Sequence, residues 1–274
     1  MISYRTQKQI LIGLATILGL LILLFLGQTI LKPKPTCVDQ KQNQSEDAID
    51  CGGPCLPCEL KDMKSLVIEK AYSLDYKLKG IDLVAEIFNP NTKYGLTNVT
   101  GYFILTNKAG ETLSKDLDEP FYILPGENKI VAKSKALIDN PNFIPESIRF
   151  DLDTVISLND WQKLPPAINN FGEVLELTGV KMKYTNSKQA SPVNITADLI
   201  NHSPLNFRRG FVDVLVCDKK TGKPLSFNQI YIENIKAEGM QGLPTISWRQ
   251  ALPLGAEVCY RKAHTDVFNK ENLY

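Results

Sequence analysis

The chain has 274 residues, of which 43% are hydrophobic and 22% charged, and its formal net charge is +1. Lysine and arginine are spread through the sequence, and no basic stripe carries interleaved aromatic side chains, which argues against a nucleic-acid-binding surface. About 240 residues follow the first apolar run, enough for two domains of ordinary size.

One apolar run begins at Ile10, ends at Leu31 and contains no charged residue. A helix of about 22 residues is about 33 Å long, which matches a hydrocarbon core of about 30 Å. A cleaved signal peptide would have a shorter apolar region followed by small residues, whereas Lys-Pro-Lys-Pro follows here at residues 32–35. The sequence therefore predicts that residues 10–31 form an uncleaved signal anchor in the lipid bilayer.

The orientation of this anchor follows from the cysteines behind it. Positive charges flank the run almost equally, so the positive-inside rule does not decide the topology. A cluster of cysteines prefers an oxidising space, so we expect residues 1–9 to be a cytoplasmic tail and the bulk of the chain to be extracytoplasmic. Ala15 and Gly19 form a small-xxx-small pair through which two helices can approach closely, giving a route to a homodimer.

Residues 32–60 are predicted to be a cysteine-rich linker stapled by disulfides. The segment between Cys37 and Cys51 is mostly polar and cannot bury enough surface to offset its ordering entropy. Two disulfides among Cys37, Cys51, Cys55 and Cys58 would supply that stability, and four cysteines allow three pairings. The sequence does not choose among the three.

Two metal alternatives stay open for this segment. Four thiolates could hold zinc, but the spacing between the first three cysteines does not match a familiar zinc knuckle. Calcium could bind oxygen ligands in addition, although their spacing differs from that of an EF-hand. The oxygen-bearing residues considered for calcium are Asp39, Asn43, Ser45, Glu46, Asp47 and Asp50.

The cysteine segment resembles a motif of bacterial cell-surface proteins, C-x-D-G-x-x-N-x-x-E-x-x-x-D-C-G-G-x-C-x-x-C. It departs from that motif at Gln40, where glycine is usual. The resemblance covers about 22 residues and implies an exposed surface or envelope protein, with little implication for activity. The matching residues are Cys37, Asp39, Asn43, Glu46, Asp50, Cys51, Gly52, Gly53, Cys55 and Cys58.

From residue 61 onward the chain is predicted to be all-β and to contain an internal repeat. Short runs rich in β-branched and aromatic residues alternate with polar turns, which is typical of β-sandwiches. Residues 84–89 (VAEIFN) align with residues 196–201 (TADLIN) at an offset of 112, although the strand after them fits better with a one-residue slip. We expect two tandem sandwiches at residues 61–160 and 174–274, joined by a linker at residues 161–173.

The first repeat contains Asn89-Pro90-Asn91 and, further on, residues 103–107 (FILTN). These segments resemble the NPN and F-x-L-Y-D signatures of small immunoglobulin-like domains of the water-stress/late-embryogenesis type. The resemblance implies a seven-stranded immunoglobulin-like sandwich, usually without catalysis. Pro90 should end a strand ladder and the two asparagines should cap the turn, which is a structural role.

The second repeat contains two further cysteines, Cys217 and Cys259, for which a disulfide and two buried thiols are both open. His202 and His264 are expected to be surface imidazoles. Trp161 and Trp248 are expected to anchor the core, with Trp248 the better candidate for an exposed contact.

No catalytic motif was found in the sequence, so we predict no catalytic, cofactor-binding or metal-binding residues and no enzyme activity. The expected function is membrane-anchored, extracytoplasmic binding, adhesion or scaffolding in the cell envelope, with a protein or cell-wall partner. The alternative is an accessory structural subunit of a secretion, pilus or transport assembly, whose membrane helix packs against other helices.

Overall fold

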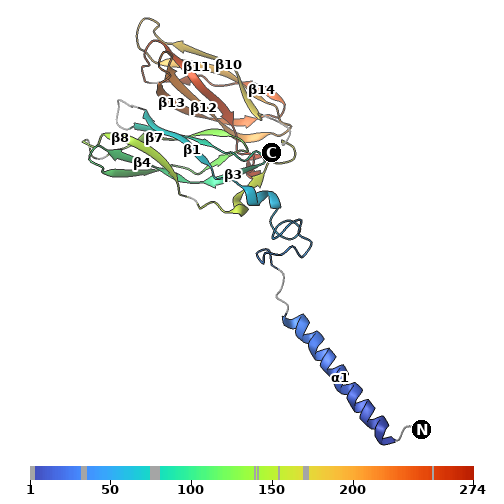
Figure 1. Ribbon diagram of the computed structural model, residues 1–274. Coiled ribbons are helices and arrows are strands. Elements are labelled where there is room, and N and C mark those ends of the chain that lie inside the picture. The colour runs from blue at the N-terminus through green and yellow to red at the C-terminus, as the bar shows by residue number, and fades with distance from the viewer. Residues whose placement is uncertain are drawn as a thin grey trace. The chain divides into compact units, whose positions relative to one another are not determined.

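The computed structural model of this protein describes residues 4–31, 36–74, 81–138, 140, 142–153, 155–168, 173–248 and 250–274. The chain divides into two compact units, Met1–Asp62 and Met63–Tyr274. Among the described residues, the first unit carries the α-helix and the second carries the named strands (Figure 1).

The first unit begins with helix α1, which covers Tyr4–Leu31. Its apolar side chains are well exposed, as Leu11, Leu23 and Phe25 illustrate with 71%, 67% and 70% of their surface accessible. Of the helices that the structure describes, none combines the length and the hydropathy that a membrane crossing requires. The cysteine-rich segment follows and ends in a short 3-10 helix, η1 (Cys58–Asp62).

The first half of the second unit, residues 63–168, forms three small antiparallel sheets in its described part. One has the order β1-β2-β7, with β1 at Val67–Leu74, β2 at Ile81–Phe88 and β7 at Asn128–Ala136. The next is β5-β4-β8, at Thr112–Asp116, Gly101–Asn107 and Pro145–Leu152. The third is β6-β3-β9, at Phe121–Ile123, Tyr94–Val99 and Gln162–Lys163; the 3-10 helix η2 (Leu158–Asp160) precedes β9.

The second half, residues 173–274, forms two antiparallel sheets in its described part. One has the order β10-β11-β14, at Leu175–Tyr184, Val193–Asn201 and Gly239–Gly242, with β15 (Ile246–Ser247) also paired to β11. The other is β13-β12-β16, at Pro224–Ile235, Phe207–Asp218 and Ala256–His264. The 3-10 helix η3 (Lys270–Asn272) lies close to the end of the chain.

The internal repeat is present at the level of strands. An offset of 112 residues moves the first residue of β2, Ile81, onto Val193, the first residue of β11, and the first residue of β5, Thr112, onto Pro224, the first residue of β13. The order β1-β2-β7 in one half corresponds to β10-β11-β14 in the other, and β5-β4-β8 corresponds to β13-β12-β16. Two sheets of each half therefore share one strand order, and the sheet β6-β3-β9 has no separate counterpart in the described part of the second half.

The turn after β4 supports the one-residue slip that the apolar pattern suggested. The side chain of Asn107 accepts the backbone N–H groups of Ala109 and Glu111. Asp218, which is 111 residues further on, caps the corresponding turn by accepting the N–H groups of Lys220 and Thr221. The second turn is thus one residue longer, which restores the offset of 112 at β13.

A buried asparagine holds equivalent loops together in both halves. Asn89 donates to the carbonyls of Tyr94 and Leu124 and accepts from the backbone N–H of Asn91. These hydrogen bonds join the end of β2 to two other connections, so the structural interpretation of the Asn-Pro-Asn segment is confirmed.

Asn201 occupies the same position in the second half. It donates to the carbonyls of Leu205 and Lys236 and accepts from the N–H of Ser203. A buried amide whose hydrogen bonds are all satisfied strongly favours one backbone conformation over others.

The second half has its own hydrophobic core. That core contains Val193 and Ile195 from β11 together with Val214 and Val216 from β12, so it lies between the two sheets of this half. Trp248 is part of it.

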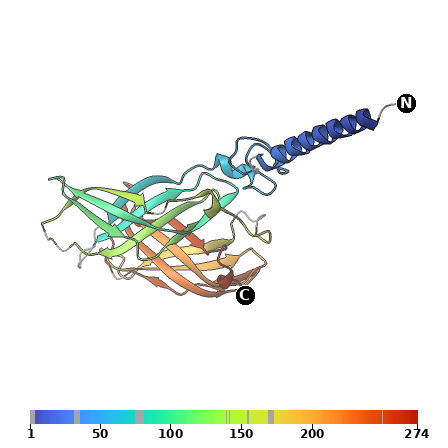
Figure 2. The ribbon, with the colours of Figure 1, turned by 90° about the horizontal axis from the view of Figure 1, so that it is seen from below.

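The two halves also bury a common face, which we call the seam. It brings Leu74, Val84 and Ile130 of the sheet β1-β2-β7 against residues of the sheet β13-β12-β16, among them Leu215 and Phe227. Figures 1 and 2 show these strands of the two halves side by side within the second unit. Since β2 and β12 are covered on both sides, their burial is nearly continuous instead of alternating. The two expected repeats therefore lie within one compact unit.

Candidate functional site

The four clustered cysteines form two interleaved disulfides. Cys37 is bonded to Cys55 across a sequence separation of 18, and Cys51 is bonded to Cys58 across a separation of 7. Because the second bond starts inside the first loop and ends outside it, the two closures constrain the same stretch of backbone. Cross-links of this kind stabilise a polar segment mainly by restricting its unfolded state.

The backbone conformation requires the two glycines of the segment. Gly52 and Gly53 have φ angles of +79° and +56°, and a Cβ added to Gly53 would lie 2.3 Å from the carbonyl oxygen of Ser45. The φ of Gln40, 60°, is also left-handed. This conformation is costly for a residue with a Cβ, so glycine would fit position 40 with less strain.

The acidic side chains of the segment bind its backbone. Asp50 accepts the N–H groups of Asp39 and Gln40, and Asp39 accepts the N–H of Lys41. Glu46 is buried and accepts the N–H groups of Asn43 and Asp50. These carboxylates, which the sequence offered as calcium ligands, act in the structure as caps for loop amides that have no strand or helix partner.

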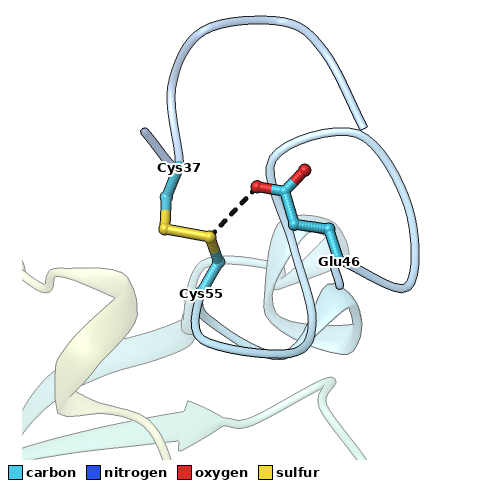
Figure 3. Close-up of side chains that lie close together, drawn as sticks. All are labelled: Cys37, Glu46 and Cys55. Atoms are coloured by element: carbon cyan, nitrogen blue, oxygen red, sulfur yellow. Dashed lines mark hydrogen bonds between the residues drawn. A yellow bond between two sulfur atoms is a disulfide. The ribbon is translucent and has the colours of Figure 1, made fainter. Parts of the chain in front are cut away.

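Glu46 also faces the first disulfide (Figure 3). Its Oε1 lies 3.1 Å from Sγ of Cys55, and one ligand atom from each of Cys37, Glu46 and Cys55 falls within 4.8 Å of the others. A disulfide sulfur carries no proton, so this is a sulfur–oxygen contact and not an ordinary hydrogen bond. The zinc alternative requires thiolates, and in the structure all four sulfurs are in disulfides.

The third disulfide joins Cys217 of β12 to Cys259 of β16, with a sequence separation of 42. The two strands are antiparallel neighbours, and the register shifts next to these cysteines so that Cys259 is an extra residue on β16. The bond fixes this irregular end of the sheet.

A buried polar cluster lies at the seam, centred on His264. Its Nε2 lies 2.9 Å from a carboxylate oxygen of Asp213, and its Nδ1 lies 2.5 Å from the hydroxyl of Tyr122 and 3.2 Å from the ammonium of Lys129. Tyr122 and Lys129 come from β6 and β7 of the first half, and Asp213 and His264 come from β12 and β16 of the second. The cluster therefore connects the two halves by hydrogen bonds.

Glu127 extends the cluster along the turn between β6 and β7. It accepts from the ammonium of Lys262 at 2.7 Å and lies 3.8 Å from that of Lys129. It also accepts the backbone N–H of Leu124. Lys262 in turn donates to the carbonyl of Asn128, so it too crosses from the second half to the first.

The electrostatics favour a neutral histidine among balanced charges. Burial and the charge of Lys129 lower the pKa of His264, while burial lowers the pKa of Lys129 against the opposing effect of Glu127. Burial by itself would raise the pKa of Glu127, but Lys129 and Lys262 outweigh it and hold the pKa at about 2. Two carboxylates and two ammonium groups thus face one another around an uncharged ring.

Two pockets flank the cluster, and His264 lines both. One, of about 440 Å³, also contains Glu127, Tyr260 and Lys262 in its wall. The other, of about 250 Å³, is lined by Lys129 and Phe211 among others. Solvent can therefore come close to the buried charges from two sides.

The prediction that His264 is a surface imidazole was wrong. Its side chain is 5% exposed, because β16 places it on the face that meets the first half. One signal for the cluster is Asp213, a charged residue inside the apolar strand segment of residues 211–217 (FVDVLVC). A strand with a buried carboxylate needs a cationic or hydrogen-bonding partner.

The other predicted residues lie as follows. His202 is half-exposed but not isolated, since its Nε2 is 2.7 Å from a carboxylate oxygen of Glu176. Trp161 and Trp248 are both buried, which confirms them as core anchors. Trp248 donates its indole N–H to the hydroxyl of Ser226 and is not the exposed contact that the sequence allowed.

Comparison of the chain with protein-family models and with curated proteins finds no match.

Proposed function

We propose that this protein is a membrane-anchored, extracytoplasmic, non-enzymatic binding or scaffolding protein of the cell envelope. In this proposal residues 10–31 cross the bilayer, the cysteine-rich segment is a stapled linker, and residues 63–274 carry the binding surface. A protein or cell-wall component is the proposed partner class.

The observation that carries the proposal is the oxidation state of the cysteines. The sequence has six cysteines, and all six are joined in three disulfides. Disulfides that are structural persist in oxidising compartments and are rare where glutathione keeps thiols reduced. An apolar run directly before such a segment supports an anchor with the disulfides on its outer side.

We further propose that each half of the second unit is an immunoglobulin-like sandwich. The second half supports this arrangement, since residues from both of its sheets share one core. The correspondence of strand order between the halves supports the same arrangement in the first. Proteins of this construction carry their binding residues on loops and strand edges of a rigid scaffold.

The test combines thiol labelling with protease access on intact cells or spheroplasts. Without reductant we expect no cysteine to react with a membrane-impermeant maleimide, and after denaturation and reduction all six should react. The undigested protein should be in the membrane fraction. Protease added outside the cells should then digest residues 63–274. Free thiols that react before reduction, or a protected second unit, would contradict the proposed location.

The accessory-subunit alternative predicts a different behaviour of α1. A Cβ built on Gly19 meets nothing within 4 Å, so a larger side chain fits the isolated helix. The double variant Ala15→Leu with Gly19→Leu distinguishes the two proposed functions. It would be expressed in cells, and detergent extracts would be run on blue-native electrophoresis. Loss of a larger assembly supports a subunit whose helix packs against others, and unchanged migration supports a tether.

A further inference from the structure

The chain has two histidines, and each has a carboxylate beside Nε2, but they differ in burial and in their other partners. His202 is half-exposed beside Glu176, whereas His264 is buried at the seam and contacts groups from both halves. We propose that the seam is an acid-sensitive latch, in which proton uptake by His264 separates the two halves while each retains its own fold.

The protonation state of His264 in the closed latch follows from the partners of its ring. Asp213 is a carboxylate with acceptor oxygens, so Nε2 of His264 carries the proton that is donated to it. Nδ1 is then unprotonated, and its lone pair accepts from the hydroxyl of Tyr122 and from an ammonium N–H of Lys129. With a neutral ring, each contact therefore has a donor and an acceptor, and the two donors share the single lone pair of Nδ1.

A second proton on the ring changes these contacts. Nδ1–H would face the ammonium of Lys129 at 3.2 Å, and the ammonium would lose its acceptor. The Tyr122 hydroxyl can turn and accept from Nδ1–H, so that contact is kept with the reverse direction. Like charges at this distance repel when water is excluded. Proton uptake therefore replaces the favourable Lys129 contact across the seam with a repulsion.

Asp213 and Glu127 favour a protonated ring, but burial and Lys129 outweigh them. Glu127 is already shared between Lys129 and Lys262, and Asp213 is shared between His264 and the amide of Gln229. These two carboxylates balance the two ammonium groups before the ring is protonated. Other titratable groups line the pockets beside the ring, namely Asp118, Glu119, Glu173 and Tyr260. Tyr122 on β6 contacts the ring directly, and Asp266 accepts amides of its own loop and the hydroxyl of Thr97.

The seam is the part of the second unit that is suited to open. Most of the core of the second half lies on the other side of β12, although Ile168 belongs to it and Leu124 and Leu164 of the first half pack against it. The two pockets beside His264 bring solvent near the buried charges, so separation exposes these charges to water while most of this core stays in place. Opening is then a domain motion and not unfolding.

The sign and size of the effect follow from linkage. Burial and Lys129 lower the pKa of His264 in the closed form below the ordinary value of 6.5, which the ring regains when the seam opens. The open form therefore binds more protons, and closure loses stability as the pH falls below 6.5. Until the pH reaches the lower pKa of the closed form, each unit of acidification raises the open-to-closed ratio by about tenfold.

Hydroxyl-radical footprinting of the full-length protein in detergent micelles tests the latch. Mass spectrometry would compare side-chain oxidation at about pH 7.5 and about pH 5, the range in which histidine titrates. Tyr122 and Phe227 are buried at the seam and should become reactive in acid. Trp248 lies in the core of the second half and should stay protected. Return to the higher pH should restore protection.

Matched variants identify the proton acceptor. His264→Gln keeps a donor for Asp213 but cannot be charged, so the acid-induced reactivity of Tyr122 should disappear. His202→Gln should leave it unchanged. Equal reactivity of the wild-type seam at both pH values would overturn the proposal, and so would an acid response that persists in His264→Gln.

The wild-type footprint decides the matter even if His264→Gln does not fold. If Trp248 becomes reactive together with Tyr122, acid unfolds the whole unit and the latch is refuted. If Tyr122 and Phe227 respond while Trp248 does not, the seam opens by itself.

Discussion

Replacement of the buried asparagine in the first half measures how strongly one side chain holds three connections together. The side chain of Asn89 is 0% exposed and makes four hydrogen bonds, two donated to the carbonyls of Tyr94 and Leu124 and two accepted from Asn91. A neutral hydrogen bond contributes about 1 kcal/mol net, and a buried group that loses its partner costs about 1–3 kcal/mol. Since these terms are not additive, we expect Asn89→Ala to lower the free energy of unfolding by about 3–4 kcal/mol.

Asn89→Asp separates hydrogen bonding from packing. It conserves the volume but replaces the donor group with an oxygen that faces two carbonyls, so the loss should be at least as large as for alanine. Asn201→Ala should cost a similar amount, because Asn201 has the equivalent contacts. Asn186 is exposed and accepts one backbone N–H, so Asn186→Ala is the matched control and should change stability by less than about 0.5 kcal/mol.

Urea denaturation of the full-length chain in detergent micelles, followed by fluorescence, is the measurement. Trp161 and Trp248 are buried in different halves and report on both. If Asn89→Ala lost less than about 1 kcal/mol, or no more than Asn186→Ala, the buried amide would not be the stabilising element that its geometry indicates.

Three further predictions concern the disulfides and the helix. Gln40→Gly should relieve the left-handed φ of 60° and stabilise the cysteine segment by about 0.7 kcal/mol, seen as about threefold slower reduction by dithiothreitol; Lys41→Gly is the control and should not slow it. Replacing both Cys217 and Cys259 with serine removes a cross-link of 42 residues and should cost about 4 kcal/mol in urea denaturation; a loss under about 1 kcal/mol would refute the loop-entropy argument. Gly19→Leu should leave the urea midpoint of the second unit unchanged, since a Cβ there meets nothing within 4 Å, and a shifted midpoint would contradict this.

The pattern of strands could be predicted from the sequence because it depends on near neighbours. Alternation of apolar residues and turn chemistry act over five to ten residues, and the offset of 112 was readable from short segments such as residues 84–89 and 196–201. Continuous burial of β2 and β12 was not predicted, because it arises from the contact between the halves and not from either half.

The cysteine segment was predicted in part. Its polar composition indicated cross-links. The pairing of Cys37 with Cys55 and of Cys51 with Cys58 depends on which sulfurs come within bonding distance, and spacing does not fix that. The role of Glu46 as a buried cap for loop amides depends on the same closure.

The sequence by itself determined an all-β chain with an internal repeat, an apolar segment ahead of it and a cluster of cysteines between them. These properties follow from composition and local periodicity. The tertiary structure decided that His264 is buried, that Asp213 and Lys129 come from different halves to meet it, and that the repeats share a face. The physical reason is distance: His264 is 51 residues from Asp213 and 135 from Lys129 in the chain, so these groups affect its pKa only once folding brings them within a few ångströms in a place that excludes water.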